Sequence, residues 1–199
     1  NLLHGVTASG KTEIYIKLLE QYIKEGKQVL FLLPEIALTT QLVQRLTAYF
    51  GNEVAVFHSK YTNNERIEVW NQVLENSPKA KVVIGVRSAL FLPFFNLGCI
   101  IVDEEHEQTF KQHDPAPRYH ARDAAIVLAK QHGAKVVLGS ATPSLETYYN
   151  VQSNKYGLTE LKVRYGNVVL PEIQLVDLKD KYFRKKMSGH FSDELLEEI

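Results

Sequence analysis

Apolar residues along this chain gather in short, mostly unbroken runs. Runs of this kind are typical of strands that are buried on both faces of a parallel sheet. The pattern predicts strands at residues 1–4, 28–33, 54–57, 81–84, 98–102 and 135–139, and further strands at residues 158–163 and 173–176.

Between these runs, apolar residues recur with the period of an amphipathic helix. Helices are expected to end at Gly26, Gly51 and Gly133, because glycine readily adopts the left-handed conformation that closes a helix. Another helix carries Trp70 on its apolar stripe, which predicts a core position for this side chain. The alternation of strands and helices predicts an α/β fold, a doubly wound and mainly parallel sheet with helices on both faces.

The alternation of predicted strands and helices becomes less regular after Asn150. We therefore expect residues 1–152 to form the main lobe, and residues 153–199 to form a connecting segment and the start of a second lobe. The chain begins without Met and ends within a helix-like segment, residues 192–199. These features predict that it is a piece of a longer protein.

The composition narrows the possible surroundings and ligands. The 199 residues include 23 Lys and Arg and 23 Asp and Glu, so the formal charge is zero and any contact with nucleic acid must be local. A single cysteine, Cys99, excludes disulfide frameworks and Cys-rich zinc sites. The apolar runs are far shorter than the ~20 residues of a membrane-spanning helix. We expect a cytoplasmic protein with no membrane partner.

One segment matches the phosphate-binding pattern G-x-x-x-x-G-K-S/T: Gly5, Val6, Thr7, Ala8, Ser9, Gly10, Lys11 and Thr12. It follows an apolar run and precedes a helical one, so its backbone N–H groups and the helix start would face the same anion. Lys11 is expected to reach the β- and γ-phosphates of ATP, and the Thr12 hydroxyl to hold Mg²⁺. The alternative is a glycine-rich turn that only begins a helix.

Asp103 and Glu104 follow the apolar run at residues 98–102. Ligands of open α/β sheets collect at the carboxyl ends of strands. Asp103 is therefore expected to hold Mg²⁺ through water, and Glu104 to orient and deprotonate the water that attacks the γ-phosphate. The alternative is a pair of solvated carboxylates at a strand end.

Residues 103–106 read D-E-E-H and residues 139–143 read G-S-A-T-P. With the phosphate-binding loop, these motifs resemble those of superfamily 2 helicases. When residues 33–39, 85–91 and 118–123 are also considered, the chain resembles the bacterial replication-restart helicases. The resemblance implies a RecA-like lobe of an ATP-hydrolysing DNA helicase with 3′ to 5′ polarity. It also implies forked or single-stranded DNA, primosome proteins and single-strand-binding proteins as partners, in a nucleoid-associated bacterial enzyme.

The same resemblance implies parts that this sequence does not contain. A second RecA-like lobe would complete the ATP site, so the chain alone is expected to be inactive. Zinc is expected only in the full-length parent. Ala8 stands where the family usually has glycine, and a positive φ there would strain the alanine.

Residues 108–119 combine aromatic and basic side chains without a helical period, which predicts a loop. Such a composition suits single-stranded DNA, because aromatic rings stack on bases and cations neutralise phosphates. By resemblance, this loop couples DNA binding to hydrolysis, with His106 as the relay. The residues predicted to sense DNA are Phe110, Lys111, Arg118 and Tyr119. The alternative is that the two aromatic side chains fasten the loop to the core.

Other positions are also predicted to contact DNA or to couple it to the nucleotide. Thr39 would hold a DNA phosphate or else cap a helix. Arg87 and Ser88 would contact the DNA backbone, with a salt bridge as the alternative for the arginine. Ser140 and Thr142 would hydrogen-bond the carboxylate cluster and couple it to the second lobe, or else form a structural turn.

Together these features predict the first motor lobe of a DNA helicase that binds ATP and Mg²⁺. Two other classes stay open. One is a non-helicase P-loop ATPase or nucleotide kinase. The other is a DNA-binding assembly module whose nucleotide site is vestigial.

Overall fold

The computed structural model describes residues 1–35, 40–58, 60–167 and 173–198. Contacts divide the chain into two compact units, Asn1–Asn167 and Val168–Ile199, which are described separately. No helix among the described residues is both long and apolar enough to cross a membrane.

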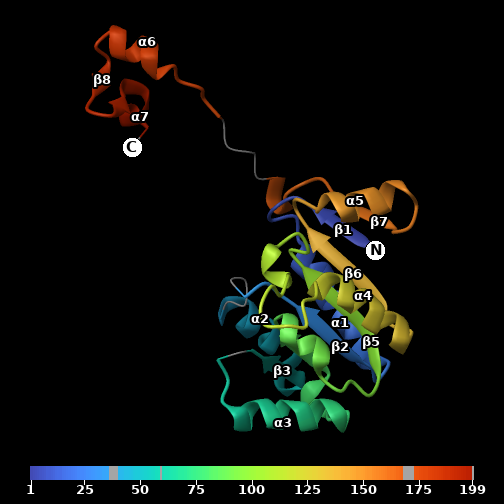
Figure 1. The fold of residues 1–199 in the computed structure, drawn as a ribbon. Helices are drawn as coiled ribbons and strands as arrows, with labels where there is room; N and C mark the ends of the chain where they lie inside the picture. Colours follow the sequence, from blue (N-terminus) through green and yellow to red (C-terminus); the bar gives the residue numbers. More distant parts are fainter. Residues whose placement is uncertain (36–39, 59, 168–172, 199) are drawn as a thin grey trace. The chain divides into compact units, whose positions relative to one another are not determined.

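The first unit is built on a seven-stranded sheet in the order β3-β4-β2-β5-β6-β1-β7, and all neighbouring strands are parallel (Figure 1). The strands are β1 (Leu2–Gly5), β2 (Gln28–Leu32), β3 (Val54–Phe57), β4 (Val82–Gly85), β5 (Leu97–Asp103), β6 (Lys135–Ser140) and β7 (Leu158–Leu161). The parallel sheet expected from the unbroken apolar runs is confirmed.

Helices cover both faces of this sheet. They are α1 (Lys11–Lys24), α2 (Thr40–Phe50), α3 (Asn63–Leu74), α4 (Ala121–His132) and α5 (Leu145–Gln152), with short 3₁₀ turns η1 (Gly51–Glu53), η2 (Pro78–Ala80), η3 (Arg87–Phe91), η4 (Gln108–Phe110) and η5 (Tyr165–Asn167). The expected ends are confirmed, since Gly26, Gly51 and Gly133 follow α1, α2 and α4 with φ of 73°, 56° and 64°. These left-handed backbones favour glycine.

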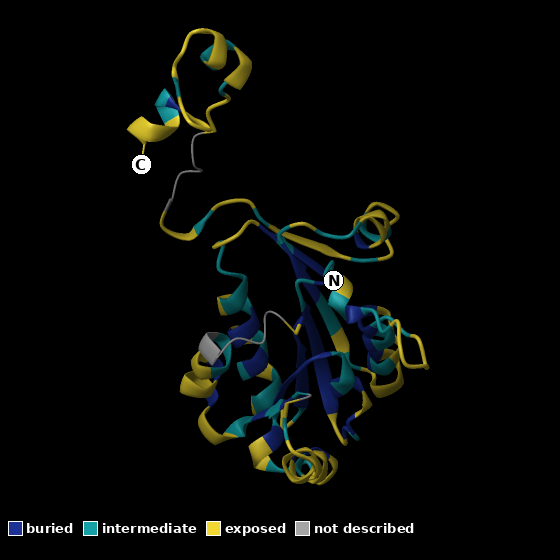
Figure 2. Cartoon of the chain, turned by 60° about the vertical axis from the view of Figure 1, so that its left-hand side comes forward, coloured by how far each residue is buried: buried dark blue, intermediate teal, exposed yellow. Residues whose placement is uncertain are grey.

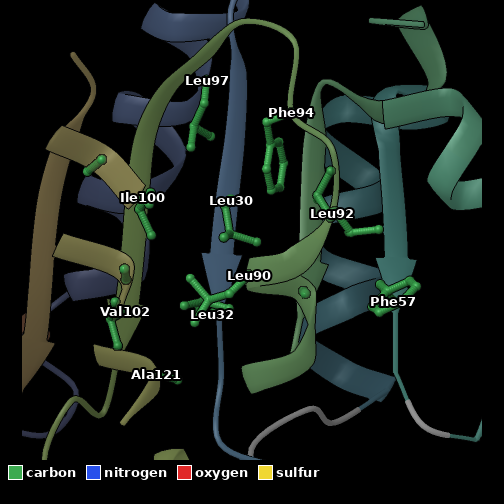
Figure 3. Packing of buried hydrophobic residues seen from close by; sticks show 14 of the residues in the cluster. Leu30, Leu32, Phe57, Leu90, Leu92, Phe94, Leu97, Ile100, Val102 and Ala121 are labelled. Atoms are coloured by element: carbon green, nitrogen blue, oxygen red, sulfur yellow. The ribbon is translucent and has the colours of Figure 1, made fainter. Parts of the chain in front are cut away.

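The two faces of the sheet carry separate hydrophobic clusters. Successive side chains of a strand point to opposite faces. Leu30 and Leu32 of β2 therefore join residues of α3, α4 and η3, whereas Val29 and Phe31 join residues of α1 and α2. Figure 3 shows Leu30 and Leu32 beside Ile100 of β5 in the first cluster. Figure 2 shows the central strands of the sheet as buried, whereas the edge strand β7 is mostly exposed.

Trp70 does not lie in the core as expected, because its side chain is 43% exposed. The buried residues of α3 are Val69 and Val73, which lie on one face at a spacing of four. Trp70 lies next to Val69 in sequence and is therefore about 100° around the helix from this face.

The first unit extends beyond the boundary expected after residue 152. β7 pairs with β1 along the whole strand, with Leu2 opposite Leu158 and Gly5 opposite Leu161. The strand expected at residues 158–163 is thereby confirmed in a shorter form. Whether the remaining residues connect to a second lobe stays a prediction.

The second unit contains α6 (Leu178–Phe183), the antiparallel pair β8 (Met187–Ser188) and β9 (Phe191–Ser192), and α7 (Asp193–Glu197). The strand expected at residues 173–176 is wrong, because this segment has no regular secondary structure. Ile173 and Leu175 are 83% and 93% exposed. This segment pairs with no strand among the described residues, so it forms no ladder.

Candidate functional site

The phosphate-binding pattern forms a loop between the end of β1 at Gly5 and the start of α1 at Lys11. Gly10 precedes the helix with φ of 90° and offers no side chain to cap it, so the positive end of α1 stays open to an anion. Ala8 has φ of 60°, which is the strained conformation anticipated for an alanine at this position. The Lys11 ammonium donates to the carbonyl oxygen of Gly5 at 2.8 Å.

This loop lines a cavity of about 680 Å³. The lining residues are Thr7, Ala8, Ser9, Gly10, Lys11, Thr12, Glu13, Arg45, Asp103, Glu104 and Tyr165. Ser9 Oγ is buried there and has no hydrogen-bond partner among the described residues. A Cβ at Gly5 would lie 2.6 Å from this oxygen and 3.0 Å from Lys11 Cγ, so a side chain at this position would displace Ser9 or Lys11. The orphaned hydroxyl and the open helix start suit an anion such as a phosphate.

The predicted carboxylates lie at the same cavity as Lys11. β5 ends at Asp103, and only β6 separates β5 from β1 in the sheet. Burial raises the pKa of Asp103, while a hydrogen bond from Tyr15 and the charge of Lys11 oppose this shift. Burial and the neighbouring Asp103 raise the pKa of Glu104. Glu104 also has φ of 49°, and strained backbone of this kind often occurs at functional sites.

Tyr15 is a site residue that the sequence did not reveal. Its hydroxyl donates to Asp103 Oδ1 at 2.8 Å across 88 residues of sequence. A Cβ at Gly139, which lies opposite Asp103 in the sheet, would come within 1.7 Å of the Tyr15 hydroxyl oxygen. The glycine of the G-S-A-T-P motif therefore makes room for the tyrosine that holds Asp103.

His106 connects the D-E-E-H and G-S-A-T-P motifs. Its Nδ1 lies 2.8 Å from Ser140 Oγ, and its Nε2 lies 3.4 Å from Thr142 Oγ1. Nδ1 also lies 3.6 Å from Glu104 Oε2. Ser140 and Thr142 thus contact the histidine and not the carboxylates of Asp103 and Glu104, which corrects the partner that the sequence suggested.

Glu105 forms a second buried link that the sequence did not reveal. Its carboxylate is fully buried and accepts hydrogen bonds from Arg122 Nη1 at 3.0 Å, from the Ser144 backbone N–H at 2.7 Å and from Thr147 Oγ1 at 2.8 Å. A buried carboxylate requires such partners. The network ties the residues after β5 to the beginnings of α4 and α5.

The loop at residues 108–119 lies partly in the core. Phe110 is 1% exposed, so the prediction that it stacks on DNA is wrong and the alternative, a core anchor, is confirmed for this residue. Tyr119 is half-buried and packs edge-on against Phe91, with ring centroids 5.1 Å apart. Lys111 is half-buried, and Arg118 is exposed. Tyr119 also packs against the core cluster, as the alternative expected, so Lys111 and Arg118 are the side chains that stay available for the predicted DNA contact.

Arg87 and Ser88 do not line the nucleotide cavity. Arg87 Nη1 donates to the carbonyl oxygen of Thr109 at 3.0 Å, and no salt bridge to Arg87 occurs among the described residues. This bond ties η3 to the loop at residues 108–119. Ser88 lines a separate apolar cavity beside Trp70. Thr39 lies outside the described residues.

A parallel sheet with a phosphate-binding loop after β1 and carboxylates after β5 has the architecture of a RecA-like P-loop lobe. Solved structures with this fold are similar. The C-terminal domain of the DEAD-box protein Dbp5 matches with a TM-score of 0.57 and 13% identity over 81% of this chain and 88% of that chain. RecG bound to a three-way DNA junction matches with a TM-score of 0.58 and 22% identity over 88% of this chain and 22% of that chain. At these identities the likeness shows the fold alone.

The family described as DEAD/DEAH box helicase matches residues 1–151. The chain therefore belongs to the DEAD/DEAH box helicase family. Similar relatives are the replication restart proteins PriA of Bacillus subtilis, 46% identical over 100% of this chain, and of Haemophilus influenzae, 50% identical over 94% of it. The matched regions cover 24% and 25% of those proteins, so the chain spans about a quarter of their length.

Proposed function

We propose that this chain is the first motor lobe of an ATP-dependent DNA helicase that acts in replication restart. The observation that carries the proposal is the single cavity lined by Lys11, Thr12, Asp103 and Glu104. Membership of the helicase family and the identity to two replication restart proteins support the class of enzyme. They do not support the alternative of a nucleotide kinase.

In this proposal the loop of residues 5–12 holds the phosphates of ATP. The start of α1 is open to an anion, and its partial positive charge would attract the phosphates. Lys11 would exchange its bond to the Gly5 carbonyl for a phosphate oxygen. The unpartnered hydroxyl of Ser9 would then gain a partner.

Thr12 and Asp103 would hold Mg²⁺. This ion takes oxygen ligands, typically one or two carboxylates together with phosphates and water, and the donors on the cavity wall fit that requirement. When bound, Mg²⁺ neutralises negative charge on the phosphates. Tyr15 would keep Asp103 oriented toward the ion through its hydrogen bond.

Glu104 would accept a proton from the attacking water. Burial and Asp103 raise its pKa, and a base works best when its pKa approaches the working pH. His106 touches Ser140 and Thr142 and lies near Glu104. A change at the carboxylates would therefore reach the G-S-A-T-P motif through this histidine.

Lys111 and Arg118 would form the single-strand DNA surface, together with Arg87 and Ser88. Arg87 bonds to Thr109 and accepts a weak hydrogen bond from Tyr119 at its carbonyl oxygen, 3.5 Å away. DNA that displaces either contact would move a loop that follows directly on the D-E-E-H motif. Forked DNA, 3′ to 5′ unwinding, and primosome and single-strand-binding proteins as partners are part of the same proposal for the full-length bacterial protein, acting in the cytoplasm.

Hydrolysis by the full-length protein tests the proposal. The Lys11→Ala variant should lower DNA-stimulated ATP hydrolysis by about 100-fold or more, because a charge that stabilises the transition state is lost. Binding to single-stranded DNA should stay unchanged, since Lys11 lines the nucleotide cavity and none of the residues proposed to contact DNA lines it. The matched control is Lys17→Ala in the same helix, where the lysine side chain is 73% exposed.

Normal hydrolysis by Lys11→Ala would contradict the proposal. A wild-type protein that binds DNA but neither binds nor hydrolyses ATP would instead identify a DNA-binding module with a vestigial nucleotide site.

A further inference from the structure

Tyr165 lies at the nucleotide cavity although it is far from the phosphate-binding loop in sequence. It begins η5, shortly after β7, and the residue is 86% exposed. Its backbone N–H donates to the carbonyl oxygen of Ala8 at 2.9 Å, and the Val6 N–H donates to Leu161 at 3.1 Å. The segment after β7 is thus held to the loop at two points, which fixes the backbone of Tyr165 beside the cavity.

The strand order places Tyr165 and the carboxylates on opposite sides of the loop. β1 has β6 and then β5 on one side, and β7 on the other (Figure 1). Asp103 and Glu104 follow β5, whereas Tyr165 follows β7. A triphosphate whose γ end lies at the carboxylates would therefore direct its nucleoside toward β7.

Tyr165 also differs chemically from the rest of the cavity wall. It is the only aromatic residue among the described residues that line the cavity, and the others are small, polar or charged. Arg45 and Glu13 form an ion pair with each other. No ring pair among the described residues includes Tyr165, so its face is free to stack on a planar group.

We propose that Tyr165 forms the base subsite of this cavity and stacks on the nucleobase of the bound nucleoside triphosphate. The inference rests on the proposed ATP site and adds the part of the ligand that the phosphate loop does not hold. Stacking tolerates different bases because each has a π face. Tyr165 would therefore strengthen the binding of ATP and GTP alike.

The test compares two probes on the full-length protein in the presence of Mg²⁺: ATP and inorganic tripolyphosphate, which has the phosphates but no base. Tyr165→Ala should weaken ATP binding by about tenfold, at the lower end of what a stacked base contributes, and change tripolyphosphate binding less than about twofold. Tyr165→Phe keeps the ring and should bind both probes as the wild type does. Tyr149→Ala, at a 69% exposed tyrosine of α5 outside the cavity, is the matched control.

If Tyr165→Ala weakened the binding of ATP and of tripolyphosphate equally, the inference would be overturned, because the tyrosine would then only support the loop. Unchanged ATP binding would overturn it as well. Tripolyphosphate binding that depends on Lys11 would leave the proposed phosphate site standing in either case. A wild-type protein that binds neither probe would contradict both the proposed site and the base subsite.

Discussion

At the scale of single residues, the site depends on backbone conformations that most residues avoid. Ala8 and Glu104 have φ of 60° and 49°. A non-glycine residue in the left-handed region costs roughly 1–2 kcal/mol. Such strain persists only where the surrounding structure holds the chain in place, and here both residues line the nucleotide cavity.

Ala8→Gly should raise the free energy of unfolding by up to about 1.6 kcal/mol. The relief of left-handed strain, roughly 1–2 kcal/mol, exceeds the entropy that glycine adds to the unfolded chain, about 0.4–1 kcal/mol. Urea denaturation of the 199-residue chain measures this difference. Ala48→Gly, at an exposed position of α2, is the control and should destabilise by about 1 kcal/mol. A destabilised Ala8→Gly variant would show that Ala8 is not strained.

Residues that are neighbours in sequence could be predicted at the site, whereas distant partners could not. The loop at residues 5–12 is contiguous, and its chemistry follows from its own spacing. The bond of Tyr15 to Asp103 spans 88 residues and that of Arg122 to Glu105 spans 17, so only the folded chain reveals them. Phe110 was misassigned because an aromatic residue in a loop looks the same in sequence whether it faces DNA or the core.

At the scale of elements, strands and helix ends followed from local patterns. Unbroken apolar runs predicted β2 and β5 because both strands are buried on both faces. The segment at residues 173–176 carries a similar pattern and is not a strand, because a strand also needs a partner, which a local pattern cannot supply. The core position predicted for Trp70 was wrong for a related reason. The apolar stripe of a helix does not show how wide the buried face of that helix is.

The Glu105 network holds three elements together, so breaking it should be costly. Arg122→Leu should lower the free energy of unfolding by about 3 kcal/mol, because it leaves a fully buried carboxylate without its charged partner. The double variant Glu105→Leu with Arg122→Leu should lose less unfolding free energy than Arg122→Leu alone, since no unpaired charge stays buried. Urea denaturation compares the two.

Lys17→Ala is the control for this comparison, because it breaks an exposed pair with Glu20 and should cost less than about 1 kcal/mol. If Arg122→Leu lowered the free energy of unfolding no more than this control does, the buried ion pair would not hold β5 to α4 and α5.

At the scale of the whole molecule, the sheet brings together groups that the sequence keeps apart. The order β5-β6-β1-β7 places the carboxylates, the G-S-A-T-P motif, the phosphate loop and Tyr165 along one edge. This order could not be derived from the sequence, although the parallel sheet could. The chain spans about a quarter of the length of its curated relatives. In the proposed motor, a second lobe would complete the ATP site.

The central claim is that one ligand contacts both the phosphate loop and the acidic end of β5. Calorimetric titration of a non-hydrolysable ATP analogue with Mg²⁺ into the 199-residue chain tests it most directly, with phosphate release from ATP measured in parallel. The account predicts binding that Lys11→Ala and Asp103→Asn each weaken by at least about tenfold and Lys17→Ala leaves unchanged, with negligible release of phosphate. The claim would be contradicted if either Lys11→Ala or Asp103→Asn left the affinity for the analogue unchanged. Rapid phosphate release would show that the lobe needs no second half.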